Sequence, residues 1–198
     1  MKPRPMPRNI LISGEIDGGC VKAAIDKIMD INYDDDLKEK DFKNWEREPI
    51  CLFINSNGGN AYDALALIDI IRQSKTPVHT IALGWCMSAG LWIFMHGHKR
   101  LIGEHATLMF HDVATWVVGK TEEVKQDLHE AQRLAKMYCK SITDVSMVKQ
   151  ETLDDYILRK AEWYIPAEEA ISIKWQLNIL SNKRGDKTPL LFDFIKKI

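Results

Sequence analysis

Short apolar segments alternate with amphipathic ones in the first half of the chain, and no other feature limits the possible folds as strongly. The apolar segments at residues 9–13, 50–55 and 78–84 have the length and composition of buried strands. The segments at 18–31 and 61–74 instead carry their apolar residues at helical spacing. This alternation predicts a layered α/β fold.

The rest of the chain is less regular. Residues 33–49 mix both signs of charge without a clear apolar face, so we expect a solvated loop or a frayed helix there. Residues 107–111 (TLMFH) are a predicted strand, and 115–119 (TWVVG) a β-like stretch. A long helix is expected over 121–145, with one apolar face. That face consists of Val124, Leu128, Ala131, Ala135, Tyr138 and Ile142.

The composition is that of an ordinary soluble globular protein. Of the 198 residues, 45% are hydrophobic and 28% charged, and the formal net charge of -1 gives no general attraction to nucleic acid or anionic lipid. The length favours one domain, the N-terminus lacks the apolar region of a signal peptide, and no segment approaches the ~20 apolar residues of a membrane span. The four cysteines are widely spaced, as isolated thiols in a reducing compartment are, so we expect a cytoplasmic protein.

Two glycines directly follow the second predicted strand, in the segment INSNGGNA. Gly58 and Gly59 would allow main-chain N–H groups to approach a ligand closely before the next helix begins. A glycine pair between a strand and a helix is more often only a turn. Its role therefore depends on what lies beside it.

Ser88 is a hydroxyl residue inside a strongly apolar segment, IALGWCMSAGLWIFMHG (81–97). It lies between a predicted strand and a predicted helix, where unpaired N–H groups favour developing negative charge. This position suits a nucleophile beside an oxyanion hole, and it equally suits a plain helix N-cap. His111, at the end of the strand 107–111, is the candidate general base, although a lone histidine there is more often structural.

The order of these features resembles the proteolytic subunits of the Clp (caseinolytic) protease family, which are self-compartmentalising serine peptidases with a crotonase-like fold. The similarity extends over about residues 8–180 and includes the family's spacing between Gly59 and Ser88. It is carried by the segments RNILISGEI, ICLFINSNGGNAYDALALIDII, TPVHTIALGWCMSAG, TLMFH and YIPAEEAISI.

The resemblance implies an α/β fold of the crotonase-like (ClpP-like) type, a stacked β/α superhelix with a projecting handle helix. It also implies a single peptidase domain over residues 1–198. The parts of that domain would be a head at about 8–112 and 160–180, a handle at about 113–159 and a C-terminal tail at 181–198.

The resemblance further implies roles for individual residues. Ser88 would be the nucleophile and His111 the general base, because serine is a weak nucleophile until a base accepts its proton. The main-chain N–H groups of Gly59 and Ala89 would form the oxyanion hole. Two fixed donors of this kind stabilise a tetrahedral oxyanion, and losing one typically costs about 3 kcal/mol.

The third member of the triad departs from the family's pattern. Glu162 occupies the position where the family usually has an aspartate, and a glutamate can also orient a histidine. The alternatives are that Asp154 or Asp155 supplies the carboxylate, or that none does.

The substrate-binding segment departs as well. Asp112 and Val113 follow His111 where the family typically has Gln-Pro, and ATWVV replaces the glycines of the family's substrate-binding strand. We expect Gly58 and Trp116 to contact the substrate, with Trp116 reshaping the groove.

The expected partners follow from the same resemblance. They are a polypeptide substrate and further copies of the chain, in a ring or double ring that encloses Ser88. The apolar face of the helix at 121–145 would be covered by a second subunit in such an assembly, or else by its own domain. Only residues 1–8 precede the first strand, fewer than the family's axial loops, which argues against docking of the family's unfoldase ATPase. Short, divergent members of the family occur in phage-like contexts, and this chain is a candidate of that type.

Two classes of function are compatible with these residues. The first is a serine endopeptidase that cleaves polypeptides through an acyl-enzyme and a Ser-His-acid triad inside an oligomeric chamber; Ser88 and His111 favour it. The alternative is a non-catalytic ring subunit or a crotonase-type acyl-CoA enzyme that uses the same pair of N–H donors. We expect no cofactor, and no metal at His96 and His98 despite their ligand-like spacing, because they lie where basic groups complement the end of a helix.

Overall fold

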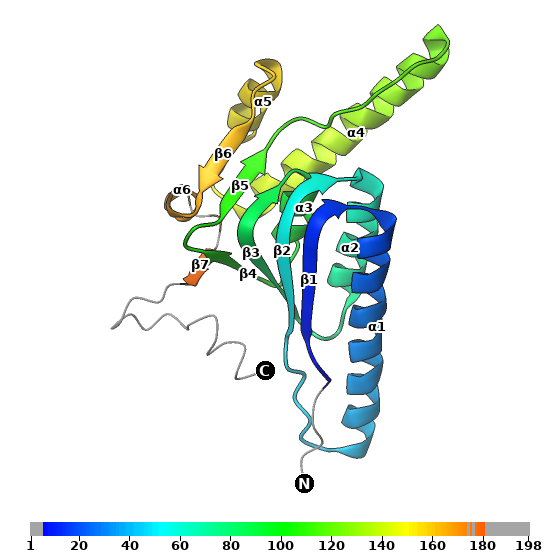
Figure 1. Ribbon diagram of the computed structural model, residues 1–198, viewed down its shortest axis with the longest axis vertical. Helices are drawn as coiled ribbons and strands as arrows, with labels where there is room; N and C mark the ends of the chain where they lie inside the picture. The colour runs from blue at the N-terminus through cyan, green and yellow to red at the C-terminus, as the bar shows by residue number, and fades with distance from the viewer. Residues whose placement is uncertain (1–5, 174, 176, 181–198) are drawn as a thin grey trace.

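The computed structural model describes residues 6–173, 175 and 177–180, which form a seven-stranded sheet with helices packed on it (Figure 1). The strands are β1 (Asn9–Ile16), β2 (Ile50–Gly59), β3 (Val78–Met87), β4 (Lys99–Gly103), β5 (Thr107–Phe110), β6 (Trp163–Pro166) and β7 (Leu177–Leu180). Their order is β1-β2-β3-β4-β7, with β5 paired to both β3 and β6. The pairs are parallel except for β5–β6.

Three helices cover one face of this sheet. The helices within the described residues are α1 (Gly18–Asp41), α2 (Ala61–Gln73), α3 (Ala89–Met95), α4 (Thr121–Val145), α5 (Gln150–Leu158) and α6 (Ala167–Ser172). Figure 1 shows α1 beside β1, with α2 and α3 following it along the same face of the sheet. Alternate residues of β2, such as Leu52 and Ile54, join the core under these helices, which confirms the predicted layered α/β arrangement.

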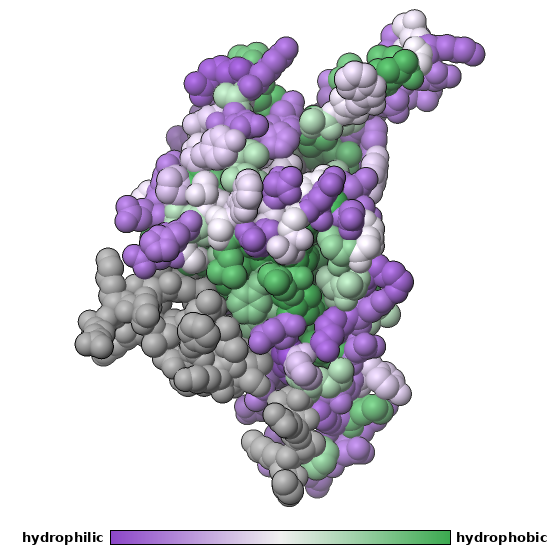
Figure 2. All heavy atoms as spheres, in the orientation of Figure 1, coloured by the Kyte–Doolittle hydropathy of each residue, from purple (hydrophilic) through white to green (hydrophobic). Residues whose placement is uncertain are grey.

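The opposite face of the sheet carries a second apolar cluster. Cys51 and Phe53 of β2 point to this face, because successive side chains of a strand alternate, and they pack with Ile81 and Leu101. Figure 2 shows hydrophobic side chains gathered over the middle of the sheet. The strands are therefore apolar on both faces, which is why β2 and β3 appear in the sequence as continuous apolar runs.

Strand β3 pairs with two different strands along its length. Residues 79–82 lie parallel to β4, and residues 85–87 lie parallel to β5. Gly84 lies between the two pairings with a φ of +53°, a conformation that glycine adopts without steric cost. The change of partner brings the carboxyl ends of β2, β3 and β5 to one edge of the sheet, where ligands of open α/β sheets bind.

Helix α4 extends away from the sheet (Figure 1). Its second half buries Leu134, Tyr138, Cys139 and Ile142, whereas Leu128 in its first half is 53% exposed. The segment before it, 112–119, is irregular, so the prediction of a β-like stretch at 115–119 was wrong. In the part of the chain that the structure describes, no strand lies beside this segment to pair with it.

The expectation of a loop or frayed helix over 33–49 was also wrong for its first half. Helix α1 continues to Asp41, and only residues 42–49 are irregular. The buried side of this part of α1 carries Asp35 instead of an apolar residue, so the usual helical pattern of apolar residues is interrupted. An ion pair between the half-buried Lys38 and Asp34, one turn apart, also supports this part of the helix.

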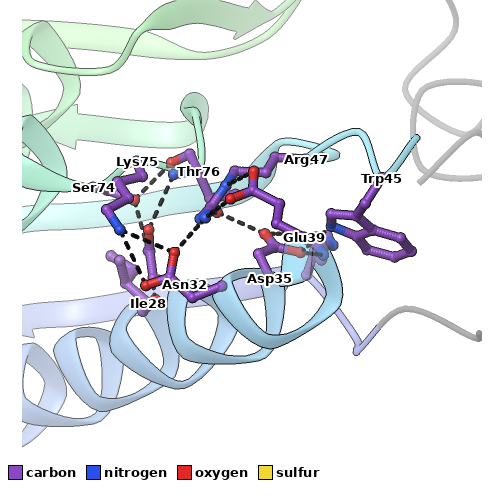
Figure 3. A network of polar contacts seen from close by, with 11 residues as sticks. Ile28, Asn32, Asp35, Glu39, Trp45, Arg47, Ser74, Lys75 and Thr76 are labelled. Carbon is purple, nitrogen blue, oxygen red and sulfur yellow. Dashed lines mark hydrogen bonds and ion pairs between the residues drawn. The ribbon is translucent and has the colours of Figure 1, made fainter. Parts of the chain in front are cut away.

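Asp35 is the centre of a buried polar network that fastens the end of α1 to the rest of the molecule. Its carboxylate accepts hydrogen bonds from both terminal nitrogens of Arg8, at 2.9 and 2.6 Å, and both side chains are fully buried. Thr76 Oγ1 and Trp45 Nε1 also donate to it, at 2.6 and 3.1 Å. Figure 3 shows Asp35 with Trp45, Thr76 and the neighbouring Arg47.

The protonation of Asp35 follows from these contacts. Burial alone would raise the pKa of this carboxyl group, but the hydrogen bonds from Arg8 and Thr76 outweigh burial, and the pKa is lowered. The contribution of the ionised Asp35 to the free energy of unfolding is therefore fully present above the pKa that this carboxyl group has in the unfolded chain. This contribution is lost as the pH falls through the lower pKa that Asp35 has in the folded protein.

Two further observations concern the whole described chain. None of its helices is long and apolar enough to cross a membrane. Its four cysteines are free thiols, of which Cys51, Cys86 and Cys139 are buried.

Removing one member of the buried ion pair should be strongly destabilising, because the other charge then stays buried without a partner. Asp35→Ala is expected to lower the free energy of unfolding by about 3–5 kcal/mol, measured by urea denaturation. Asp26→Ala removes an exposed ion pair with Lys22 on the same helix and is the matched control. That variant should lose less than about 1 kcal/mol. Equal losses in the two variants would contradict the role given to the buried pair.

Candidate active site

A cleft of about 620 Å³ lies at the carboxyl ends of β2, β3 and β5. Most of the residues predicted for the site line it. These are Gly58 and Gly59 at the end of β2, Ser88 and Ala89 after β3, and His111 and Trp116 after β5. Glu162 is not among the residues that line it. The strand ends thus bring together residues that are far apart in sequence.

Ser88 has an unusual backbone conformation between β3 and α3. Its φ and ψ are +50° and −120°, and such a conformation costs a residue with a side chain on the order of 1–3 kcal/mol. The N–H of Ser88 donates to Met109 O at 2.9 Å, which extends the β3–β5 pairing by one step. Although Ser88 is the N-cap of α3, its side chain makes no capping hydrogen bond. The hydroxyl is therefore available for another purpose.

Gly58 and Gly59 owe their identity to close backbone packing. Gly58 has a φ of +109°, and a methyl group on it would lie 2.7 Å from Ser88 Cβ. A methyl group on Gly59, whose φ is +149°, would lie 2.3 Å from Ile16 O. Gly14, with a φ of +87°, has open space around it, so a positive φ does not by itself bring such crowding. The pair is thus more than a turn, because the absence of side chains lets the backbone of β2 approach Ser88 closely.

His111 follows the last residue of β5 and is partly exposed at the cleft. Within the described residues, no hydrogen bond joins its ring to Ser88 Oγ. Catalytic hydrogen bonds are often long in the absence of substrate and tighten when it binds. The position is set by the β3–β5 pairing, because Met109, the acceptor of the Ser88 N–H, lies two residues before His111.

The register of β5 and β6 leads toward His111 on one strand and Glu162 on the other. β5 and β6 pair antiparallel, and their last paired residues are Phe110 and Trp163. His111 directly follows β5 and Glu162 directly precedes β6, so an extension of the ladder by one step would set them opposite each other. Glu162 is exposed, and its carboxylate accepts a hydrogen bond from Tyr164.

The alternative carboxylates have other partners. Asp154 accepts a hydrogen bond from Gln150 at 2.8 Å, and Asp155 forms an ion pair with Arg159. Both lie on α5, are exposed, and are absent from the lining of the cleft.

A polar bridge between α2 and α4 forms one wall of the cleft. Tyr62 donates to Glu130 at 2.8 Å, and Arg133 forms an ion pair with the same carboxylate at 2.7 Å. The hydrogen bonds from Arg133 and Tyr62 lower the pKa of Glu130 to about 2, and the bond to Glu130 raises the pKa of Tyr62. Trp116, which is 92% exposed, lies on the irregular segment that borders the cleft.

Tyr138 belongs to the site, although its sequence position indicated only the apolar face of a helix. Its ring borders the cleft and its hydroxyl donates to Ser88 O at 3.1 Å. A signal was present in the sequence, because a buried tyrosine in an otherwise apolar stripe usually requires a hydrogen-bond partner. The identity of that partner depends on the packing of α4 against α3.

The histidines after α3 have structural partners. His96 Nδ1 contacts Trp92 O at 2.9 Å, and His98 Nδ1 accepts from the N–H of Val78 at 3.1 Å. Arg100 donates to the carbonyls of Met95 and Gly97 at the end of α3. The described residues contain no group of three or more His, Cys, Asp or Glu side chains arranged to hold a metal ion.

Comparison with known proteins identifies the family. The family model "Clp protease" matches residues 7–173. An ATP-dependent Clp protease proteolytic subunit of Pleurastrum terricola is 30% identical over 132 residues, which are 66% of this chain and 61% of that protein. Subunit 3 from Synechococcus sp. (strain CC9605) is 25% identical over 166 residues, or 82% of this chain and 77% of that protein.

A solved structure has a similar fold. A ClpP1 mutant from Listeria monocytogenes superimposes with a TM-score of 0.74 and 21% identity, covering 90% of this chain and 94% of that one. This likeness confirms the predicted ClpP-like fold. Since the family model matches most of its length, the chain belongs to the Clp protease family.

Proposed function

We propose that this protein is a serine endopeptidase that cleaves polypeptides through an acyl-enzyme. The observation that carries the proposal is the presentation of Ser88 at a positive φ, with an uncapped hydroxyl, over the glycine turn of β2 and in the same cleft as His111. Strain of this kind at a strand-to-helix turn is typical of a nucleophile. A serine that only capped a helix would form the capping hydrogen bond that Ser88 lacks.

The reaction begins when Ser88 Oγ attacks the carbonyl carbon of the scissile peptide bond and His111 accepts the hydroxyl proton. His111 then gives this proton to the leaving amine, the C–N bond breaks, and the acyl group remains on Ser88. Water, deprotonated by His111, then attacks the ester carbonyl. The bond to Ser88 Oγ breaks, His111 returns the proton to this oxygen, and the acid is released.

The N–H groups of Ala89 and Gly59 are the proposed donors to the oxyanion. Ala89 is the first residue of α3, so its N–H has no acceptor within the helix. Gly59 is the last residue of β2, and both residues line the cleft. Two such donors stabilise the negative charge that develops on the substrate oxygen.

Glu162 is the proposed third member of the triad. Support comes from the β5–β6 register, which leads to His111 on one strand and Glu162 on the other. A side-chain rotation that exchanges the Tyr164 hydroxyl for the imidazole N–H would let this carboxylate orient His111. Asp154 and Asp155 are less suitable because they lie on α5 and have other partners.

The substrate is proposed to lie along the irregular segment 112–117, with Gly58 and Trp116 in contact with it. The edge of this segment has no strand partner among the described residues, so an extended peptide can pair with it. The exposed ring of Trp116 offers an apolar contact for a substrate side chain.

Several copies of the chain are proposed to form a ring, or a double ring, that encloses Ser88. Support comes from the first half of α4, where Val124 and Leu128 lie one helical turn apart and are 37% and 53% exposed. An apolar stripe on a projecting helix needs a covering surface, and a second copy of the same chain provides one.

The first test is labelling with a fluorophosphonate probe, which reacts with activated serines. The native protein should be labelled at Ser88, and His111→Ala should reduce the labelling rate at least about 100-fold, since general base catalysis contributes that much. The site is read by mass spectrometry, and circular dichroism checks the fold. Equal labelling of the native and urea-unfolded protein would remove the proposal of an activated nucleophile.

The role of Glu162 is tested by a conservative pair of variants. Glu162→Gln should lower kcat for a reporter peptide about 100-fold or more, because the carboxylate no longer orients and stabilises the protonated His111. Glu162→Asp keeps the charge and should retain part of the activity. Asp155→Asn on α5 serves as the control. If Glu162→Gln has the activity of the unmodified protein, the third member lies elsewhere or is absent.

Assembly is tested by light scattering. The protein should have a mass several times that of the 22.8 kDa chain, and Leu128→Glu together with Ala135→Glu should dissociate it and lower peptidase activity. A matched control, Lys125→Glu, changes a charged side chain of the same helix that lies outside the apolar stripe. A fully active monomer of the unmodified protein at micromolar concentration would exclude the chamber.

A further inference from the structure

Tyr138 is held rigidly between α4 and the core. The side chain is 3% exposed, and its ring packs against Trp92 and Phe110 with centroid distances of 5.3 Å to each. Its hydroxyl donates to Ser88 O at 3.1 Å. Burial raises the pKa of this hydroxyl well above its ordinary value, so it remains a proton donor at neutral pH.

The carbonyl of Ser88 accepts two hydrogen bonds. One is the ordinary first bond of helix α3, from the N–H of Trp92 at 3.0 Å. The other is the bond from Tyr138, and it comes from a different helix. On the other side of the same residue, the N–H of Ser88 is held by Met109 O. The peptide groups on both sides of the Ser88 Cα are therefore fixed, which a disfavoured positive φ requires.

The carbonyl of Ser88 and the N–H of Ala89 belong to one peptide group. Such a group is planar and nearly rigid, so a bond that fixes the direction of the C=O also fixes the direction of the N–H. A hydrogen bond accepted by the oxygen also polarises the amide, which makes its N–H a stronger donor. A donor to Ser88 O therefore acts on Ala89 N–H without touching it.

We propose that Tyr138 is a positioning residue for the oxyanion hole. Through the Ser88–Ala89 peptide group, its hydroxyl aims and strengthens the Ala89 N–H for the negative charge of the tetrahedral intermediate. The inference rests on the proposed peptidase function and adds a part to it that is supplied by α4. Because the effect is exerted on the oxyanion, it should appear in kcat and not in the binding of the uncharged substrate.

The test compares Tyr138→Phe with the unmodified protein. The variant keeps the ring and its stacking and removes only the hydroxyl. We expect kcat for a reporter peptide to fall about tenfold, the size of one neutral hydrogen bond, while KM changes by less than about twofold. A peptide boronic acid, which becomes tetrahedral on Ser88, should bind more weakly by the same factor as the loss in kcat.

Ser141→Ala is the matched control. Ser141 lies one turn beyond Tyr138 on α4, and its hydroxyl accepts a hydrogen bond from Trp92 Nε1 at 2.9 Å, so it also joins α4 to α3 but does not touch Ser88. This variant should lose thermal stability to a similar extent and keep both kcat and boronate affinity within about twofold. The comparison thus separates positioning from packing.

Three outcomes would overturn the inference. If both variants lose kcat equally, the hydroxyl contributes only packing between the helices. If Tyr138→Phe keeps full kcat and boronate affinity, the Ala89 N–H needs no support from Tyr138. If the unmodified protein neither cleaves peptides nor reacts with a fluorophosphonate probe, the proposed function itself fails, and this inference fails with it.

Discussion

The hydrogen bond from Ser88 N–H to Met109 O is the interaction on which the geometry of the cleft depends. It continues the pairing of β3 with β5 beyond the last residue of β3, at the point where the chain turns sharply into α3. The chain of β5 then needs only two more residues to reach His111. One backbone hydrogen bond therefore determines how the candidate nucleophile and the candidate base are placed. Neither side chain has to contribute to that placement.

The glycine pair of β2, Gly58 and Gly59, sets a second constraint on the position of Ser88. The contact of Gly58 with Ser88 leaves no room for a side chain, and Gly59 passes equally close to the backbone of β1. These contacts prevent Ser88 from relaxing toward β2, while the bond to Met109 holds it toward β5. A strained φ is retained in a folded protein only when the surroundings determine it from several sides. Here the surroundings are two strands and, through the Tyr138 hydroxyl, one helix.

Some of this arrangement could be predicted from sequence and some could not. The order of Gly58, Ser88 and His111 along the chain, each after an apolar run, was enough to recognise the resemblance to the Clp protease family, and that resemblance implied a common site. The structure places all three residues at the carboxyl ends of parallel strands, at one edge of the sheet. The end of α1 could not be predicted, because its buried face carries a charge, Asp35, whose partner Arg8 directly precedes β1 and is 27 residues away in the sequence. Local periodicity contains no information about such a pairing.

The same limit applies to β4, β6 and the segment 115–119. β4 begins with Lys99 and Arg100, and the four residues of β6 give too short a pattern to distinguish a strand from a turn. TWVVG has the composition of a strand, yet strand composition produces a strand only where another strand supplies hydrogen bonds. The β5–β6 register, on which the case for Glu162 depends, is likewise a product of the tertiary structure.

Helix α4 contributes both to the candidate active site and to the surface on which the proposed assembly depends. The inner side of its second half is buried and carries Tyr138, which contacts Ser88, while its first half exposes Val124 and Leu128. A helix is stiff over this length, because backbone hydrogen bonds join each turn to the next. Anything that covers the exposed half restricts the motion of the whole helix, including the turn that carries Tyr138. If a second copy of the chain provides that cover, assembly and the orientation of the Ala89 N–H are coupled through one rigid element, and the oxyanion hole is best ordered in the enclosed state.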